Sequence, residues 1–229
     1  MKKSILYLVF IIILSNSSFG QYKYEIQNGS KNYFAKMNVE NCLDDHCEGN
    51  GTIDLFDKET KKLIQTFTSD DLYFYYDTNK KPTVKVIQLY NEQSPLIFDD
   101  FNFDGSEDLA IRNGNHSSYG GPSYDIYVSN LSKTKFFLSS ELTELVEENL
   151  GMFETDSKRK RIITYSKSGC CWHQKSEYMV IPNKGLKLVY IFEEDATGGE
   201  FVKVITKKLI KNKWKVKIEK FKLDEYYKD

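Results

Sequence analysis

Apolar and polar residues alternate with a period of two along most of the chain after residue 21, and short polar turns interrupt the alternation. Successive side chains of a strand point to opposite faces of a sheet, so this pattern predicts half-buried β-strands. The 16 Tyr and 15 Phe, together with many Ile, Thr and Val, favour the same state. We therefore expect an all-β fold, with strands at 22–27, 33–39, 52–57, 62–67, 72–76, 83–90, 96–98, 108–112, 124–129 and 135–138.

A hairpin pattern of apolar strand, polar turn and apolar strand then recurs along the sequence. The later turns lie near Lys133, Ser157, Lys184 and Asn212, which is roughly one hairpin with its connection per repeat. This repetition predicts an array of antiparallel hairpins with a propeller-like arrangement, although the period is shorter than a four-stranded blade. The segments are IDLFDKETKKLIQTF, DIYVSNLSKTKFFL, GMFETDSKRKRIITY, YMVIPNKGLKLVYI and VITKKLIKNKWKVKI.

One short helix is expected near residues 140–150. Ser139 or Ser140 can cap its start, and Leu142, Leu145 and Val146 fall on one helical face. Acidic residues in the first turn suit the positive end of the helix dipole. The helix should end near Gly151 because no later residue continues the pattern.

Residues 1–20 form a secretory signal peptide in this interpretation. Lys2 and Lys3 precede an apolar run from Ile5 to Leu14, and small residues Ser18 and Gly20 precede the expected cut before Gln21. The apolar run is about half the length needed to span a bilayer, so we expect no transmembrane segment after cleavage. Residues 21–229 then form a single β-rich domain, exported to the periplasm or secreted, where disulfides persist.

The charge balance argues against a nucleic-acid partner. The 32 Lys and Arg residues nearly match the 33 Asp and Glu residues, giving a formal net charge of −1. Non-specific binding of DNA or RNA needs a net excess of basic residues that neutralise phosphates. The chain has only three His and no nucleophile motif, so we also expect that it is not an enzyme.

The most specific motif is the acidic loop DFNFDGSED. It places the side chains of Asp100, Asn102, Asp104 and Asp108 at positions 1, 3, 5 and 9, with the Ser106 carbonyl at position 7. Calcium requires such hard oxygen ligands, and Gly105 at position 6 permits the sharp turn between them. Phe101 and Phe103 alternate with the ligands and are expected to point toward the core. The alternative is an Asp-, Asn- and Gly-rich turn that holds no metal.

This loop departs from an EF-hand at position 12. An EF-hand has a bidentate Glu there, whereas this chain has Ile111 within a strand-like run. We therefore expect a strand-loop-strand calcium site with a dissociation constant of roughly 10⁻⁴ to 10⁻³ M. Calcium at this site would be structural.

A second loop follows closely, with Gly120, Gly121 and Pro122 between hydroxyl and tyrosine residues. A turn of this composition between two strands forms a rigid exposed loop that can present aromatic side chains to a partner. An ordinary connection is the alternative, and nearness in sequence to the acidic loop favours a function. The candidate partner-binding residues are Tyr119, Gly120, Gly121, Ser123 and Tyr124.

The segments DFNFDGSEDLAI, GGPSYDIYV and FETDSKRKRIITYSKSG, followed by Glu177 and Tyr178, together resemble a family of exported bacterial calcium-binding proteins. The family includes an immunity protein against a lysozyme-type effector of a type IV secretion killing system, and the resemblance covers roughly residues 96 to 190. It implies a propeller-like fold, calcium at Asp100, Asn102, Asp104 and Asp108, and inhibition of a peptidoglycan hydrolase by loop insertion. The acidic decapeptide alone also resembles FG-GAP repeats, which implies instead a calcium-dependent adhesion or glycan-binding module.

The four cysteines are Cys42, Cys47, Cys170 and Cys171, and the sequence leaves their pairing open. A Cys42–Cys47 bridge would close a short loop, whereas adjacent Cys170 and Cys171 are closer than most disulfide partners. Local pairing and pairing between the two clusters are both compatible with the sequence. A zinc site that uses these thiols and His46 or His173 is a further alternative.

The last strand pattern lies in a lysine-rich segment between Lys203 and Lys222. Trp214, Val216 and Ile218 alternate with lysines there, which predicts a half-buried strand with a charged outer face. Lysines of this kind commonly keep an edge strand from pairing with another chain. The alternative is attachment to an anionic glycan or lipid surface.

Overall fold

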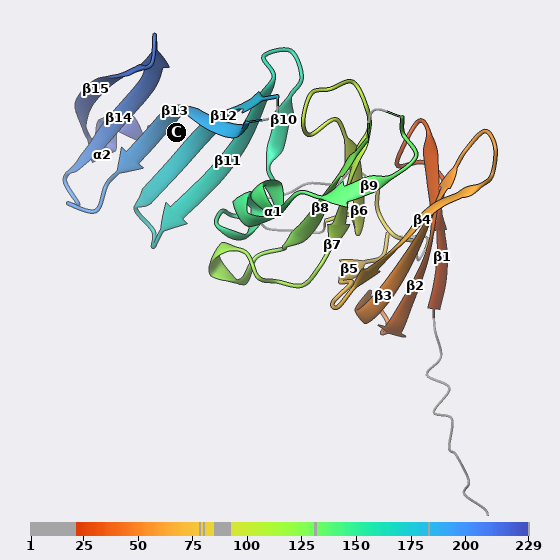
Figure 1. Ribbon diagram of the computed structural model, residues 1–229. Coiled ribbons are helices and arrows are strands. Elements are labelled where there is room, and N and C mark those ends of the chain that lie inside the picture. The colour runs from red at the N-terminus through yellow and green to blue at the C-terminus, as the bar shows by residue number, and fades with distance from the viewer. Residues whose placement is uncertain are drawn as a thin grey trace, which may run out of the picture.

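The computed structural model describes residues 22–77, 79, 81–84, 93–130, 132–182 and 184–228. The expected signal peptide at 1–20, and most of the expected strand at 83–90, lie outside these residues. Antiparallel sheets are the main secondary structure of the described chain, so the all-β prediction is confirmed. Three sheets follow one another across the molecule in chain order (Figure 1).

The first sheet contains five strands in the order β1-β2-β3-β4, with the short β5 paired to β3. The second, central sheet has the order β6-β7-β8-β9, and the third has the order β10-β11-β12-β13-β14-β15. The first-sheet strands are β1 (Tyr22–Ile26), β2 (Tyr33–Cys42), β3 (His46–Asp57), β4 (Leu63–Ser69) and β5 (Phe74–Tyr75). The central strands are β6 (Leu96–Asp99), β7 (Asp108–Arg112), β8 (Tyr124–Ser129) and β9 (Phe136–Leu138). The third-sheet strands are β10 (Glu154–Asp156), β11 (Arg161–Ser168), β12 (Trp172–Ile181), β13 (Gly185–Asp195), β14 (Phe201–Ile210) and β15 (Lys213–Lys222).

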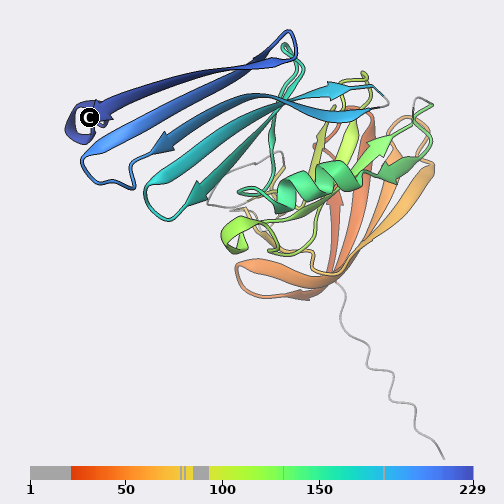
Figure 2. The same cartoon turned by 60° about the vertical axis from the view of Figure 1, so that its left-hand side comes forward.

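The hairpin array is confirmed, but none of the three sheets forms a propeller blade arrangement. Each expected hairpin is present as β3–β4, β8–β9, β10–β11, β12–β13 or β14–β15. No sheet is closed or strongly curled. The reason is that the last three hairpins, β10–β11, β12–β13 and β14–β15, join edge to edge into a single open sheet of six strands (Figure 2), while β8–β9 belongs to the central sheet. The structure therefore does not show the propeller-like arrangement.

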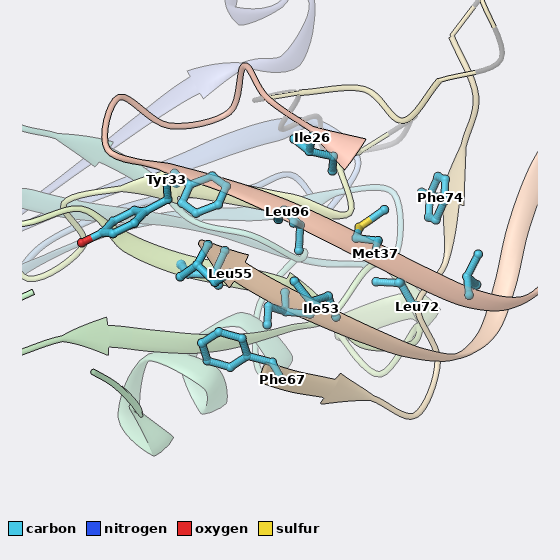
Figure 3. Close-up of a cluster of buried hydrophobic side chains, with 14 of the residues drawn as sticks. Ile26, Tyr33, Met37, Ile53, Leu55, Phe67, Leu72, Phe74 and Leu96 are labelled. Atoms are coloured by element: carbon cyan, nitrogen blue, oxygen red, sulfur yellow. The ribbon is translucent and has the colours of Figure 1, made fainter. Parts of the chain in front are cut away.

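The central sheet is buried on both faces and organises the core. One face packs on the first sheet through Leu96, Phe98, Leu109 and Ile111. Figure 3 shows Leu96 near Met37 and Ile53 of the first sheet. All five residues of β7 are buried, which explains why its sequence shows an apolar run in place of alternation.

The other face of the central sheet packs against the helix and the third sheet. Helix α1 (Ser140–Glu147) buries Leu142, Leu145 and Val146, as its periodicity predicts. It ends before Gly151, and Ser139 occupies the N-cap position without a side-chain capping hydrogen bond. Ala110, Tyr124 and Ile126 of the central sheet share this second core with Ile162 of β11 and the helix.

The C-terminal end of the third sheet extends beyond both main cores (Figure 2). A small cluster of Ala196, Val202 and Val204 is covered by the short helix α2 (Leu223–Tyr226). Trp214, Val216 and Ile218 of β15 are all exposed. The expectation of a half-buried strand is therefore wrong, because α2 reaches only the end of β15, where Tyr226 packs on Phe221, and no layer of the described chain covers Trp214, Val216 and Ile218.

Candidate functional site

The acidic loop joins two paired strands of the central sheet. Strand β6 ends at Asp99, β7 begins at Asp108, and these two residues are register partners. The strand-loop-strand arrangement expected from the sequence is therefore present. Phe101 and Phe103 are buried as expected, and Gly105 has a φ of +90°, which favours glycine.

The side chains of the loop organise its own backbone. The Asp100 carboxylate accepts hydrogen bonds from the amides of Asp104 at 3.0 Å and Gly105 at 2.8 Å. Asn102 Oδ1 accepts from the Asp104 amide at 2.9 Å, and Asp104 Oδ1 accepts from the Ser106 amide at 2.8 Å. These contacts hold the loop in a series of tight turns. Because each oxygen has two lone-pair sites, the same oxygens keep acceptor capacity for a cation.

Asp108 lies at the base of the loop and is fully buried. Its Oδ2 accepts from the amides of Phe101 at 2.9 Å and Asn102 at 3.3 Å, and its Oδ1 accepts from the Ser129 amide at 2.8 Å. Burial raises the pKa of this carboxyl to about 7, although these hydrogen bonds oppose the shift and Asp104 adds to it. Asp108 therefore fastens the loop to β8, a role that the sequence motif does not reveal.

The oxygen atoms of the acidic loop are of the kind that calcium binds, but the described residues do not form a preformed calcium site. Burial, together with the neighbouring charge of Asp104, raises the pKa of Asp100. Among the residues that the structure describes, no basic side chain forms an ion pair with Asp100, Asp104 or Asp108. Crowded carboxylates without a counter-charge favour a bound cation. Within that same part of the chain, however, no three or more Asp, Glu, His or Cys side chains are grouped to hold a metal ion.

Glu107, which is not among the predicted calcium ligands, ties the acidic loop to the first sheet. Its carboxylate accepts from the Ser30 hydroxyl at 2.8 Å, the Lys31 amide at 3.1 Å and the Asn32 side chain at 2.7 Å. Burial opposes its ionisation, yet these hydrogen bonds lower the pKa of Glu107. The loop thus contacts the turn between β1 and β2, far away in sequence.

The predicted partner-binding loop, residues 113–123, lies at the other end of β7 and is called the tyrosine loop here after Tyr119. This strand runs from Asp108 to Arg112, so the two loops are separated by roughly 14 Å of extended chain. The two loops are close in sequence, but β7 holds them apart. An ion at the acidic loop would act on the tyrosine loop only through the packed central sheet.

The tyrosine loop presents one tyrosine side chain at its tip. Tyr119 is 61% exposed and stands in the short 3₁₀ turn η1 (Ser118–Gly120). Its backbone has a φ of 60°, a left-handed conformation that is uncommon for tyrosine. Gly120 is exposed beside it and Gly121 is partly exposed. These three residues form the accessible part of the predicted partner loop.

Ser123 and Tyr124 are buried, so they support the loop from below and do not lie on its exposed tip. The Tyr124 hydroxyl donates to the carbonyl of Ser94 at 2.8 Å, and the Ser123 hydroxyl accepts from the His116 amide at 3.0 Å. Buried Arg112 donates to Asn115 Oδ1 at 2.6 Å and to the Ser123 carbonyl at 3.3 Å. These contacts fix both ends of the loop.

Tyr119 also contacts the turn between β11 and β12. The Gly169 amide donates to its hydroxyl at 2.7 Å, and the Lys167 ammonium lies 4.8 Å from its ring centre. The exposed tyrosine is therefore held in one orientation and carries a positive charge at its side. Neither partner could be found from the motif, because both lie about fifty residues further along the chain.

The cysteines form two local disulfides, Cys42–Cys47 and Cys170–Cys171. The pairing that joins the two clusters is absent, and none of the four thiols is free to bind zinc. Cys42 and Cys47 are register partners across the β2–β3 hairpin, whose geometry places them together. Two disulfides are consistent with an oxidising compartment outside the cytoplasm.

A cavity of about 650 Å³ lies beside the acidic loop. Asn102 and Asp104 form part of its wall, and the start of α1 contributes Glu141 and Leu142. Its remaining lining is mainly apolar and comes from the acidic loop itself, the N-cap of α1, strand β8 and the β12–β13 hairpin: Phe101, Phe103, Ser139, Val128, Val180, Ile181, Pro182, Gly185 and Leu186. In the described part of the chain, no helix has the length and apolar character needed to cross a membrane.

No protein-family model and no curated protein sequence matches the chain. Its fold is similar to a solved structure described as "Structure of a Xanthomonas Type IV Secretion System related protein", with a TM-score of 0.62. The similarity covers 88% of this chain and 94% of that chain at 20% sequence identity. At this identity the comparison establishes a shared fold.

Proposed function

We propose that the chain is an exported, non-enzymatic binding protein, stabilised by calcium, that inhibits a peptidoglycan hydrolase of the lysozyme type. The observation that carries the proposal is the exposed Tyr119, held by Gly169 and accompanied by Lys167. A preorganised aromatic side chain loses little conformational entropy on binding, which makes it a suitable anchor for an inhibitor. The fold shared with a type IV secretion system related protein supports the same proposal.

The charge beside Tyr119 suits the catalytic cleft of such an enzyme. Glycoside hydrolases use a pair of carboxyl groups on either side of the scissile bond. An aromatic ring can occupy the sugar-binding surface of the cleft, while the Lys167 ammonium faces the carboxylates. Tyr119, Gly120 and Gly121 would contact the enzyme, and Ser123 and Tyr124 would support them.

The inhibition test uses the exported chain against a panel of lysozymes and lytic transglycosylases in millimolar calcium. We expect dose-dependent loss of activity for at least one lysozyme-type hydrolase, reversed when the inhibitor is denatured. An equal amount of a Tyr119→Ala variant serves as the matched control. Full activity of every enzyme at a hundredfold molar excess of the chain would contradict the proposed function.

Calcium would bind through the side chains of Asp100, Asn102, Asp104 and Asp108 and the Ser106 carbonyl. For a dissociation constant of roughly 10⁻⁴ to 10⁻³ M, 10 mM calcium adds about 1.4 to 2.7 kcal/mol to the free energy of unfolding. The melting temperature should then rise by roughly 3 to 10 °C relative to chelator. Asp104→Ala should abolish the rise, and an unchanged melting temperature of the parent chain would exclude calcium.

The cavity beside the acidic loop favours a second candidate, a calcium-dependent adhesion or glycan-binding module. Asn102 and Asp104 line this cavity, so a bound ion could face a ligand there. Pull-down from an envelope extract separates the two functions. Capture of a hydrolase supports the inhibitor, whereas release of the chain by free glycans and by chelator supports the module.

A further inference from the structure

Strand β15 leaves one long edge of the third sheet open. It pairs with β14 along its whole length, from Lys213 opposite Ile210 to Lys222 opposite Phe201. In the described part of the chain no strand pairs with its other edge. The opposite edge strand, β10, has only three residues. An open edge of ten residues is a template for pairing with another chain.

Apolar side chains of β15 are also exposed to solvent. Trp214, Val216 and Ile218 are 42%, 56% and 59% exposed, and they lie on the same face of the strand. The tight turn at Lys211 and Asn212, both with positive φ, fixes the register of β15 against β14. The edge is therefore a defined surface that combines apolar groups with free hydrogen-bonding groups.

Lysines along β15 restrict what can pair with it. They occupy positions 213, 215, 217, 220 and 222, and the single acid is Glu219. Directly opposed like charges destabilise a pair of strands. A second copy can thus pair with this edge only in a register that keeps lysine away from lysine.

We propose that two copies of the chain associate through antiparallel pairing of their β15 strands around a two-fold axis at Ile218. Residues 214–222 of each copy then pair, and Ile218 faces Ile218 of the second copy. Lys217 faces Glu219 of the second copy, and the symmetry forms this ion pair twice. The observed contact between Lys217 and Glu219 within one chain, at 2.7 Å, extends these pairs into a network of four charges.

The remaining opposed pairs in this register are also compatible. Lys215 faces Phe221 of the second copy, and Trp214 faces Lys222, so both lysines lie next to aromatic rings. The last pair places Val216 opposite Lys220, whose aliphatic stem can cover it. No lysine faces another lysine anywhere along the paired segment.

Neighbouring registers lack this property. An axis at Lys217 places that lysine opposite itself, and an axis at Glu219 does the same for the glutamate. Directly opposed residues of an antiparallel pair share one face of the sheet, so an axis halfway between two residues is not available. An axis at Val216 opposes Lys215 to Lys217 twice, and an axis at Lys220 places that lysine opposite itself. The self-complementary register at Ile218 is what favours a second copy over an unrelated acidic strand.

The test is sedimentation velocity of the exported chain over a concentration series from micromolar to several hundred micromolar. Two paired edge strands form a small interface, so we expect reversible dimers whose fraction rises with concentration. Lys217→Glu and Glu219→Lys each oppose like charges twice across the axis and should weaken association about tenfold or more. The double variant restores both pairs with reversed signs and should associate within about threefold of the parent. Since Lys217 is exposed and Glu219 is partly exposed, their exchange should leave the fold intact.

Lys158→Glu, in the exposed turn between β10 and β11, changes the net charge by the same amount as Lys217→Glu and should leave association unchanged. A parent chain that stays monomeric throughout the series overturns the proposal. Equal weakening in the double variant and in the single variants also overturns it. Binding to phosphatidylglycerol vesicles that Lys217→Glu weakens and Glu219→Lys strengthens, without self-association, overturns it in favour of an anionic surface.

Discussion

Replacing Asp108 with alanine is expected to lower the free energy of unfolding by about 3 kcal/mol or more, in chelator as well as in calcium. The carboxylate accepts hydrogen bonds from the amides of Phe101, Asn102 and Ser129, and alanine leaves all three without that acceptor. An unsatisfied buried donor costs about 1 to 3 kcal/mol, and the relief of burying a carboxylate offsets part of the sum. For a chain of this size the melting temperature should fall by roughly 6 to 12 °C.

Asp104→Ala is the matched control for this substitution. Asp104 is exposed and, among the residues that the structure describes, accepts only from the Ser106 amide and the Asn102 side chain, so its loss in chelator should cost about 1 kcal/mol or less. Calcium should then stabilise neither variant. In chelator, only Asp108→Ala should have a melting temperature well below that of the parent chain. Equal melting temperatures of the two variants in chelator would show that Asp108 serves only as a ligand.

The different roles of Asp104 and Asp108 show how far the sequence could predict the site. The spacing of the acidic loop identified its turn, its flanking strands and the burial of Phe101 and Phe103, because all of these depend on neighbouring residues. The bond from the Ser129 amide to Asp108 spans 21 residues, and the Glu107 contact with Ser30 spans 77. Such contacts depend on how the sheets pack, which period-two alternation does not encode.

The same distinction applies to the fold. Every recurring hairpin could be predicted, because a hairpin is set by two adjacent strands and the turn between them. The arrangement of hairpins could not, since a repeated hairpin can build a blade or extend an open sheet. Ser123 and Tyr124 illustrate the consequence on a small scale. Their composition suggested an exposed loop, but the burial of β7 on both faces draws the start of β8 into the core.

Strand β7 links the two candidate loops physically. Its first residue, Asp108, fixes the base of the acidic loop, and its last residue, Arg112, fixes the tyrosine loop through Asn115 and Ser123. A cation at the acidic loop would thus stabilise the central sheet on which Tyr119 is mounted. We expect calcium to change the stability of the protein more than the local geometry around Tyr119.

Replacing Tyr119 with alanine is expected to weaken inhibition of the target hydrolase by about 30-fold or more while leaving the rest of the fold intact. Loss of a central aromatic anchor commonly costs 2 kcal/mol or more of binding free energy, which corresponds to that factor. The side chain is 61% exposed, so its removal leaves no cavity in the core. The inhibition constant and the melting temperature of the variant should both be measured.

Two further variants separate the anchor from its support. Tyr119→Phe keeps the ring but removes the hydroxyl that accepts from the Gly169 amide at 2.7 Å, so its inhibition constant should lie between those of the parent and the alanine variant. Tyr22→Ala removes another exposed tyrosine, on β1 of the first sheet, and should inhibit like the parent. If Tyr119→Ala inhibits as strongly as Tyr22→Ala, the contact surface lies elsewhere, because an exposed ring that is held in place and makes no contact with the enzyme contributes no binding free energy.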